Sequence, residues 1–249
     1  MGTTKWVEGT VVDQIRWTDR LFSLRVEADL GAFEAGQHAT LALPVNGELV
    51  TRPYSFVNAP KERPCEFHYV VVPEGPFSAR LARLESRDVV FLAPAPSGLF
   101  VLSSIPDAEI LWLLATGTGI GPYLSMLKTD APWRRFGQVV LVHSVRHADE
   151  LAYRDAIAAI ARRYPSQLRV ITLTSREEAA GSLPGRIAET IEDRRLEKAV
   201  RLELSPKTSQ VMICGSPKAI GDITEALRPR GMRRHRRREP GHISLENYW

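Results

Sequence analysis

Residues 109–122 read EILWLLATGTGIGP, a run of apolar residues that ends in a glycine-rich turn. A continuous apolar run bounded by turn residues predicts a strand buried on both faces. Gly117, Gly119 and Gly121 let the backbone turn tightly and approach a ligand without a Cβ in the way. Pro122 suits the first turn of a helix, whose free N–H groups favour an anion. The stretch predicts a strand–turn–helix unit, whose turn either binds an anionic group or is only a connection.

The order of strand then helix continues to the end of the chain. Apolar strand patterns lie at 138–145, 168–175 and 209–215, helical patterns at 121–128, 149–164, 185–199 and 217–228, and a last strand pattern at 242–249. This alternation predicts a doubly wound parallel sheet covered on both faces. The glycine turn matches neither the G-x-G-x-x-G dinucleotide fingerprint nor a Walker A loop.

The first hundred residues follow a different pattern. Six short runs rich in β-formers are separated by turn residues, and one helix is expected at 78–84. This spacing predicts a small antiparallel barrel or sandwich. We therefore expect a β-barrel domain over residues 1–103 and an α/β domain over residues 104–249.

The totals exclude several classes of protein. The 249 residues, with 44% hydrophobic and 25% charged residues, suit one or two soluble domains. No signal peptide or membrane span is recognisable, so we expect a cytoplasmic protein. The two cysteines, Cys65 and Cys214, supply neither a disulfide framework nor an iron–sulfur cluster, and we expect no metal site.

Three arginines follow the predicted parallel strands. VLVHSVR ends on Arg146, ITLTSR ends on Arg176, and LPGR brings Arg186 to the next helix. Ligands of open parallel sheets bind beyond the carboxyl ends of the strands, and guanidinium groups suit a terminal phosphate. Singly, each arginine is an ordinary surface residue. Their equivalent positions indicate a polyanionic ligand and favour NADP over NAD.

Two further stretches leave two interpretations open. MICG ends on Cys214 at the same sheet edge, either as inert packing or as a small polarisable group near a reacting carbon. TRPYSF, residues 51–56, is either an exposed barrel edge guarded by Pro53 or a ligand site. Arg52 and Tyr54 share one face of the strand, which suits a ligand with a phosphate and an aromatic plane. Gly75 and Ser78 precede a short helix, another possible phosphate site.

Together these stretches resemble the ferredoxin–NADP reductase family. TRPYSF is similar to its R-x-Y-S motif, ATGTGIGP to its glycine-rich NADP loop and VMICGSP to its C-G segment. The ending PGHISLENYW resembles the bacterial ferredoxin/flavodoxin–NADP reductases. The resemblance covers essentially the whole chain, in order. Pro53 occupies a variable position, and Gly121 stands where many relatives have alanine.

The resemblance implies an FAD-binding barrel followed by an NADP-binding α/β domain. Arg52 is expected on the FAD pyrophosphate, Tyr54 against the isoalloxazine and Ser55 near flavin N5, as a catalytic contact. Cys214 and Tyr248 are the other expected catalytic residues. Tyr248 and Trp249 cover the flavin and its adenine, in an order left open. The remaining expected cofactor-binding residues are Pro53, Tyr69, Val70, Val71, Val72, Pro76, Phe77 and Ser78 for FAD, and Gly117, Thr118, Gly119, Gly121, Val145, Arg146, Ser175, Arg176 and Arg186 for NADP(H).

The implied function is electron transfer between NADPH and ferredoxin or flavodoxin, by hydride transfer to flavin N5 and single-electron transfers to the carrier. One alternative is an NAD(P)H-dependent reductase component that supplies an oxygenase or another acceptor. A second, from another class, is a nucleotide- or nucleic-acid-binding module without redox activity. We expect a monomer.

A basic run, RPRGMRRHRRR at residues 228–238, concentrates the net charge of +4. It holds seven arginines, and the remaining 26 lysines and arginines face 29 acids. The run is either a solvated turn or a docking patch for an acidic carrier, with the patch expected at Arg233, Arg234, Arg236, Arg237 and Arg238. Nucleic-acid binding is disfavoured, because no reader motif or interleaved aromatic residue accompanies the run.

Overall fold

The computed structural model describes residues 6–248, which form two compact units. Within the described range, the first unit comprises residues 6–101 together with 121–129, and the second comprises 102–120 together with 130–248. The chain therefore returns once to the first unit after the glycine-rich turn. The boundary predicted at residues 103 and 104 stays a prediction. Within the described range, no helix is both long enough and apolar enough to cross a membrane.

The first unit contains a six-stranded antiparallel sheet, as the β-rich pattern predicts. The strand order is β4-β3-β6-β1-β2-β5, so β4 and β5 are the two edges. The helix expected at 78–84 begins earlier, because Pro76 can occupy the first helical turn without losing a hydrogen bond. The elements are β1 (Val7–Arg16), β2 (Leu21–Glu27), β3 (His38–Val45), β4 (Glu48–Ser55), β5 (Cys65–Val70), α1 (Pro76–Leu81) and β6 (Val89–Leu92).

Alternation along these strands builds the core of the first unit. Leu24 and Val26 of β2 face the same interior as Leu41 and Leu43 of β3, and all four are buried. Arg25, between the two β2 residues, is partly exposed, whereas Ala42 between the two β3 residues is buried as well. Tyr54 of β4 packs against the edge of this core.

The returning segment 121–129 is anchored to the loop before β5. Ser125 Oγ donates a hydrogen bond to the Asn58 carbonyl at 2.7 Å, and Lys128 pairs with Glu62 at 3.1 Å. Tyr123, which is fully buried, lies 5.8 Å from the Phe100 ring. These contacts explain why the helix after the glycine turn belongs to the first unit from residue 121 onward.

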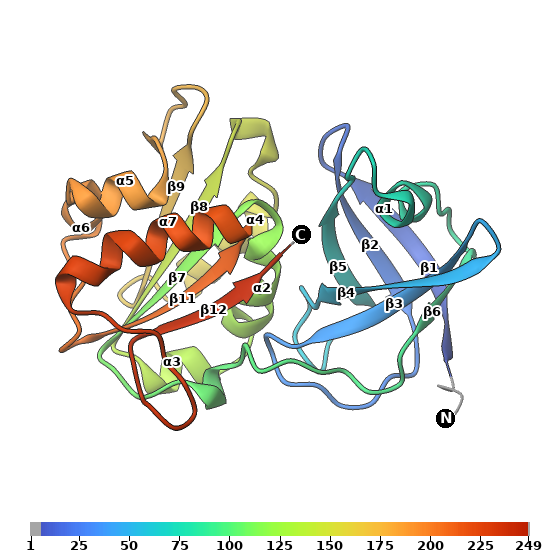
Figure 1. The fold of residues 1–249 in the computed structure, drawn as a ribbon, viewed down its shortest axis with the longest axis horizontal. Helices are drawn as coiled ribbons and strands as arrows, with labels where there is room; N and C mark the ends of the chain where they lie inside the picture. Colours follow the sequence, from blue (N-terminus) through green and yellow to red (C-terminus); the bar gives the residue numbers. More distant parts are fainter. Residues whose placement is uncertain (1–5, 249) are drawn as a thin grey trace. The chain divides into compact units, whose positions relative to one another are not determined.

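The second unit is a six-stranded sheet in the order β10-β9-β8-β7-β11-β12, with every pairing parallel. The predicted doubly wound fold is confirmed (Figure 1). The elements that follow β6 along the chain are η1 (Leu102–Ser104), β7 (Ile110–Thr116), η2 (Gly117–Gly119), α2 (Ile120–Leu127), α3 (Ala131–Arg135), β8 (Gln138–Val145), η3 (Ala148–Glu150), α4 (Arg154–Arg163), β9 (Leu168–Thr174), β10 (Ser182–Pro184), α5 (Ile187–Glu192), α6 (Arg195–Val200), β11 (Ser209–Gly215), α7 (Pro217–Leu227), η4 (Arg228–Arg230) and β12 (Ile243–Asn247). All of them belong to the second unit except α2, which belongs to the first unit from residue 121 onward.

Both faces of the parallel sheet are covered. Trp112 and Leu114 of β7 pack with residues of α5, α6 and α7 on one face, while Leu111 and Leu113 are equally buried on the other. Figure 1 shows α7 crossing in front of the sheet. The continuous apolar runs of the sequence reflect this two-sided burial.

One helix prediction is wrong. The pattern at 185–199 suggests a single helix, but the structure has α5 and α6 with a break at Arg194, where φ is +61°. Asp193 explains the break, because its carboxylate accepts the Arg195 N–H at 2.9 Å and so begins α6. Neither α3 nor the short strand β10 is predicted by the sequence patterns.

Candidate active site

The strand order places the glycine turn at a topological switch point. The chain leaves β7 toward β8, β9 and β10, then returns to the other side of β7 with β11 and β12. Ligands of open α/β sheets bind outside the carboxyl ends of the strands at such a point. Gly117–Gly119 follow β7, and Cys214-Gly215 end β11, so the two predicted stretches meet there.

Two glycines allow the two chain segments to lie very close together. A Cβ on Gly119 would lie 2.4 Å from the Cys214 carbonyl oxygen, and one on Gly215 would lie 1.9 Å from Thr116 Oγ1. Gly117 differs, because its φ is +53° and nothing lies within 4 Å of its Cβ position. Gly119 and Gly215 are therefore required by packing. Gly117 leaves its backbone open to a ligand, which fits a dinucleotide at this turn.

Gly121 plays no such steric part. A Cβ at this position would lie 3.4 Å from Val57 Cγ2, which is an ordinary van der Waals contact. An alanine, as the resemblance leads one to expect here, is therefore compatible with the fold.

His143 holds the glycine turn by a hydrogen bond to its backbone. The sequence patterns do not single out this residue. The side chain is buried in β8, and its Nε2 lies 3.0 Å from the Gly117 carbonyl oxygen. Burial lowers the pKa of His143 to about 4, so the imidazole is neutral near pH 7. Because the partner is a carbonyl, Nε2 carries the proton and donates it. Only the three-dimensional neighbourhood identifies this residue.

The Cys214 thiol is neutral and buried. Burial raises its pKa well above the ordinary value, the charge of Glu246 acts in the same direction, and a hydrogen bond with the Tyr248 side chain opposes both. A thiol with a raised pKa is a poor nucleophile. The Tyr248 N–H donates to the Gly215 carbonyl at 2.7 Å, which brings Tyr248 beside Cys214. Trp249 lies outside the described residues.

Glu246 is a second site residue that the sequence patterns do not single out. It lies on β12 opposite Cys214, in the parallel register Cys214↔Glu246. Burial raises the pKa of its carboxyl from the ordinary 4.5 to about 7. A carboxyl group that can hold a proton near neutral pH therefore stands beside the buried thiol.

The three predicted arginines gather at the carboxyl edge of β8, β9 and β10. The Arg176 N–H donates to the Arg146 carbonyl at 3.0 Å, and the Gly185 N–H donates to the Thr174 carbonyl at 3.0 Å next to Arg186. All three side chains are exposed, and within residues 6–248 none forms an ion pair. Val145 and Ser175 precede them, tied by the Ser175 N–H to the Val145 carbonyl at 3.1 Å.

In the first unit, TRPYS forms the second half of the edge strand β4. Within the sheet, β4 pairs only with β3, so its outer edge keeps free backbone groups. Arg52 is exposed and Tyr54 half-buried, with the Tyr69 ring 5.9 Å and the Phe77 ring 6.0 Å away. Burial raises the pKa of Tyr54 to about 12, against the opposing charge of Arg52. An open edge with a cation and a flat ring fits a flavin dinucleotide.

The segment from β5 to α1 lies beside this edge. The Tyr69 hydroxyl donates to Gln14, while Val71 receives hydrogen bonds from the Arg20 guanidinium at 3.1 and 3.2 Å. Ser78 Oγ accepts from the Val72 N–H at 3.0 Å and donates to the Gly75 carbonyl at 3.2 Å. The Ser78 hydroxyl therefore closes its own turn, which leaves the backbone of 76–78 as the part able to meet a ligand.

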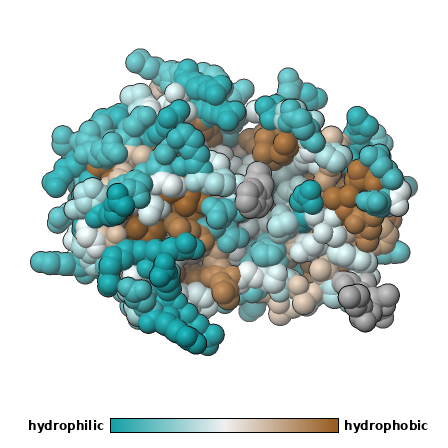
Figure 2. Space-filling model, in the orientation of Figure 1, coloured by the Kyte–Doolittle hydropathy of each residue, from teal (hydrophilic) through white to brown (hydrophobic). Residues whose placement is uncertain are grey.

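The basic run divides into structural and exposed arginines. Arg230 forms an ion pair with Glu197 at 2.8 Å and donates to the Leu204 carbonyl at 3.3 Å, with its side chain 16% exposed. Arg228 pairs with Glu225 on the surface and stays exposed. The other five follow η4 in the loop to β12, where Figure 2 shows hydrophilic side chains gathered. Arg233 and Arg236 share Glu239, whereas Arg234, Arg237 and Arg238 are exposed without an ion pair to residues 6–248.

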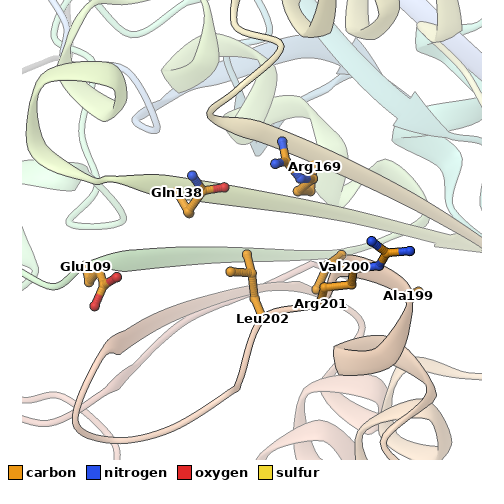
Figure 3. A pocket seen from close by; sticks show the side chains of 7 residues that line it. All are labelled: Glu109, Gln138, Arg169, Ala199, Val200, Arg201 and Leu202. Atoms are coloured by element: carbon orange, nitrogen blue, oxygen red, sulfur yellow. The ribbon is translucent and has the colours of Figure 1, made fainter.

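A shallow cavity of about 700 Å³ lies at the opposite, amino edge of the parallel sheet (Figure 3). None of the predicted site residues lines it, and it is remote from the switch point along the same strands. Its lining consists of Glu109, Gln138, Arg169, Ala199, Val200, Arg201 and Leu202.

Fold and sites together define a two-module oxidoreductase, with a flavin module followed by a nicotinamide dinucleotide module. The family model described as oxidoreductase FAD-binding domain matches residues 10–101, and the oxidoreductase NAD-binding domain model matches residues 113–225. The chain belongs to the flavodoxin/ferredoxin–NADP reductase family. It is 46% identical to the flavodoxin/ferredoxin–NADP reductase of Escherichia coli (strain K12), covering 98% of this chain and 99% of that one.

Other relatives agree with this assignment. The ferredoxin–NADP reductase of Pseudomonas aeruginosa is 31% identical, over 92% of each chain. A ferredoxin NADP⁺ reductase from Neisseria gonorrhoeae, solved with bound FAD and NADP, superposes with a TM-score of 0.92 at 31% identity, covering 98% of this chain and 99% of that one. The predicted family, fold class, enzyme class and cofactors FAD and NADP(H) are confirmed.

The raised pKa of Glu246 predicts a pH dependence of stability. Between pH 4.5 and about 7 the folded protein holds a proton that the unfolded chain has lost, so stability falls as the pH rises through this window. Glu246→Gln stays neutral and lacks this loss. Thermal unfolding is measured with saturating FAD. We expect the Tm difference, Glu246→Gln minus wild type, to increase from about pH 5 to about pH 8.

The exposed acid Glu203 of the same unit provides the control, since Glu203→Gln also removes one charge. Its Tm difference from the wild type should vary little over this range. A constant difference for Glu246→Gln as well would contradict the raised pKa.

Proposed function

We propose that the chain transfers electrons between NADPH and ferredoxin or flavodoxin, and that the two sites divide this work. The glycine turn and three exposed arginines at one edge of the parallel sheet carry the proposal, because they suit a dinucleotide with an additional phosphate. FAD, when bound in the first unit, supplies the chemistry that links a two-electron donor to a one-electron acceptor. The residues of the protein bind and orient the two cofactors and supply charged groups for the phosphates and the carrier.

On the FAD side, three residues of β4 have separate roles. The Arg52 guanidinium is placed to bind the pyrophosphate, and the Tyr54 ring offers a plane for the isoalloxazine. Ser55 holds a hydrogen-bonding group near flavin N5. Pro53 shapes the strand edge, where its missing N–H is tolerated. The backbone of residues 69–72 and 76–78 lines the rest of the site.

On the NADP side, the backbone of Gly117–Gly119, with Thr118, receives the dinucleotide at the switch point. Arg146, Arg176 and Arg186 bind the 2′-phosphate, supported by their exposure at one sheet edge. Val145 and Ser175 line the approach to them.

The carboxyl end of β11 receives the nicotinamide. The neutral Cys214 packs beside the reacting carbon as a small polarisable group, which its raised pKa supports. The expectation that Tyr248 and Trp249 cover the flavin stays a prediction, since Trp249 lies outside the described residues. An aromatic residue over the flavin would have to move aside before the nicotinamide enters.

Tyr54→Ala tests the FAD assignment. Loss of the ring should raise the Kd for FAD about tenfold, because an aromatic contact contributes on the order of 1 kcal/mol beyond its buried area. Tyr54→Phe keeps the ring and should retain FAD. The measurement is fluorescence titration of the apoprotein with FAD. Equal retention by both variants would place the isoalloxazine elsewhere.

Arg176→Ala tests the phosphate assignment. Removal of a charge-assisted hydrogen bond should raise the KM for NADPH about tenfold and leave the KM for NADH unchanged. Arg169→Ala is the matched control, because Arg169 lies near the other end of the same strand, in the cavity of Figure 3. An equal loss for both nucleotides would contradict a 2′-phosphate role.

The partner surface is the loop between η4 and β12. Arg233, Arg234, Arg236, Arg237 and Arg238 are proposed to dock an acidic carrier, since opposite charge accelerates encounter. Arg230 is excluded from this surface because its side chain is mostly buried and paired with Glu197. Arg228 is excluded because it lies in η4, before the loop. The exposed arginines without an ion pair, Arg234, Arg237 and Arg238, should contribute most.

The triple variant Arg234→Ala/Arg237→Ala/Arg238→Ala tests docking. At low salt the second-order rate of flavodoxin or ferredoxin reduction should fall about tenfold, and its dependence on ionic strength should weaken. Reduction of a small uncharged dye should not change.

A control triple variant, Arg162→Ala/Arg194→Ala/Arg201→Ala, removes the same charge from exposed positions of the same unit. If it slows carrier reduction equally, net charge and not the loop governs encounter. Tight binding of duplex DNA by the wild type, lost in the first triple variant, would favour the nucleic-acid alternative.

A reductase component for another acceptor is the second candidate. It is favoured by the fold alone, since the Amycolatopsis cytochrome P450 reductase GcoB superposes with a TM-score of 0.79 at 25% identity. The near-complete mutual coverage with flavodoxin/ferredoxin–NADP reductases favours the first function. A cytoplasmic location is proposed with the first function, supported by two free buried cysteines. A monomeric state is proposed as well.

A further inference from the structure

We infer that Glu177 is a positioning residue that sets the spacing of Arg146 and Arg176 and so the preference for the 2′-phosphate. The inference rests on the proposed role of these arginines. Glu177 does not need to touch the nucleotide. It acts by joining the two loops from which the arginines project.

The backbones of the two loops already run side by side. β8 and β9 pair in parallel up to Val145↔Thr174, and the pairing continues when the Arg176 N–H donates to the Arg146 carbonyl at 3.0 Å. Beyond this point no sheet partner holds either loop. A side chain that bridges the loops therefore restrains the two loop backbones from which the guanidinium groups project.

Glu177 forms that bridge with both carboxylate oxygens. Oε1 accepts the Ala148 N–H at 2.5 Å, and Oε2 lies 3.3 Å from His147 Nδ1. These bonds lower the pKa of Glu177, with the Ala148 bond contributing most, so the carboxylate is ionised at neutral pH. Thr174 Oγ1 donates to the Glu177 carbonyl at 2.8 Å and holds the base of the bridge.

Glu150 also binds the loop that carries Arg146, through the backbone N–H groups of that loop. Its carboxylate accepts the Arg146 N–H at 2.8 Å and the His147 N–H at 3.3 Å. Both acids therefore bind loop backbone and not the neighbouring guanidinium groups. The arginines stay free of ion pairs with the described residues although two carboxylates lie close by in sequence.

This arrangement predicts an effect opposite to that of simple electrostatics. Removing a negative charge near a phosphate site should strengthen phosphate binding if charge alone matters. Removing a positioning bond should weaken it, because the two guanidinium groups lose their fixed separation. The sign of the change separates the two explanations.

The experiment compares Glu177→Ala, Glu177→Gln and Glu178→Ala. Glu178 is the next acid in the chain, exposed and without a hydrogen bond to residues 6–248, so it matches the lost charge. Binding of adenosine 2′-phosphate is measured by calorimetry on the FAD-containing protein, with adenosine 5′-phosphate as the reference ligand. Steady-state KM values for NADPH and NADH are measured alongside.

For Glu177→Ala we expect the Kd for adenosine 2′-phosphate and the KM for NADPH to rise about fivefold, as for the loss of one well-placed hydrogen bond. Values for NADH and kcat should stay within about twofold of the wild type. Glu177→Gln keeps an acceptor for the Ala148 N–H and should recover most of the affinity. Glu178→Ala should leave NADPH binding unchanged or slightly stronger.

Two outcomes would overturn the inference. If Glu177→Ala binds adenosine 2′-phosphate as well as the wild type, or better, the carboxylate does not position the arginines. If NADPH and NADH weaken equally, the role is general stability of the unit. Arg176→Ala separates this failure from that of the proposed function: if that variant keeps its affinity for adenosine 2′-phosphate, the phosphate assignment itself is wrong.

Discussion

The close approach of β7 and β11 at their carboxyl ends is the constraint on which the second unit depends. Gly119 and Gly215 permit it, because a Cβ on either would collide with Cys214 or Thr116. This contact brings the glycine turn and the Cys214 strand end to a single switch point. The His143 hydrogen bond then fixes the turn from below, with a buried imidazole that stays neutral. The proposed cofactor site at this edge therefore depends on backbone packing before any charged residue is considered.

The arginines of the second unit differ in whether a neighbouring acid pairs with their side chain. Arg230 forms a mostly buried ion pair with Glu197, whereas Arg146, Arg176 and Arg186 have no ion pair to the described residues. Nearby acids are turned toward backbone N–H groups, as Glu150 and Glu177 show. A carboxylate used as a loop acceptor no longer competes for a guanidinium group. Arginines of one unit are therefore paired with an acid in one place and left without an ion pair in another.

Several candidate site residues could be proposed from the sequence, because their signal is local. The glycine turn follows an apolar strand, and the arginines close the next strands, so parallel topology alone brings them to one edge. The R-x-Y-S stretch is recognisable as a motif. By contrast, His143 and Glu246 lie within strands that read as ordinary β-structure, and no spacing distinguishes them. Their burial, which gives each its shifted pKa, exists only after folding.

The sequence by itself determined the two-unit architecture, the family and the cofactor class, since period, turn residues and motifs are properties of short segments. Only the tertiary structure decided which side chains in those segments are used in hydrogen bonds and ion pairs within the protein and which can meet a ligand. It divided the basic run into structural and exposed arginines, broke the helix expected at 185–199 at Arg194, and used the Ser78 hydroxyl to close a turn. The physical reason is that hydrogen bonds and ion pairs between distant residues depend on register and burial, which no short segment specifies.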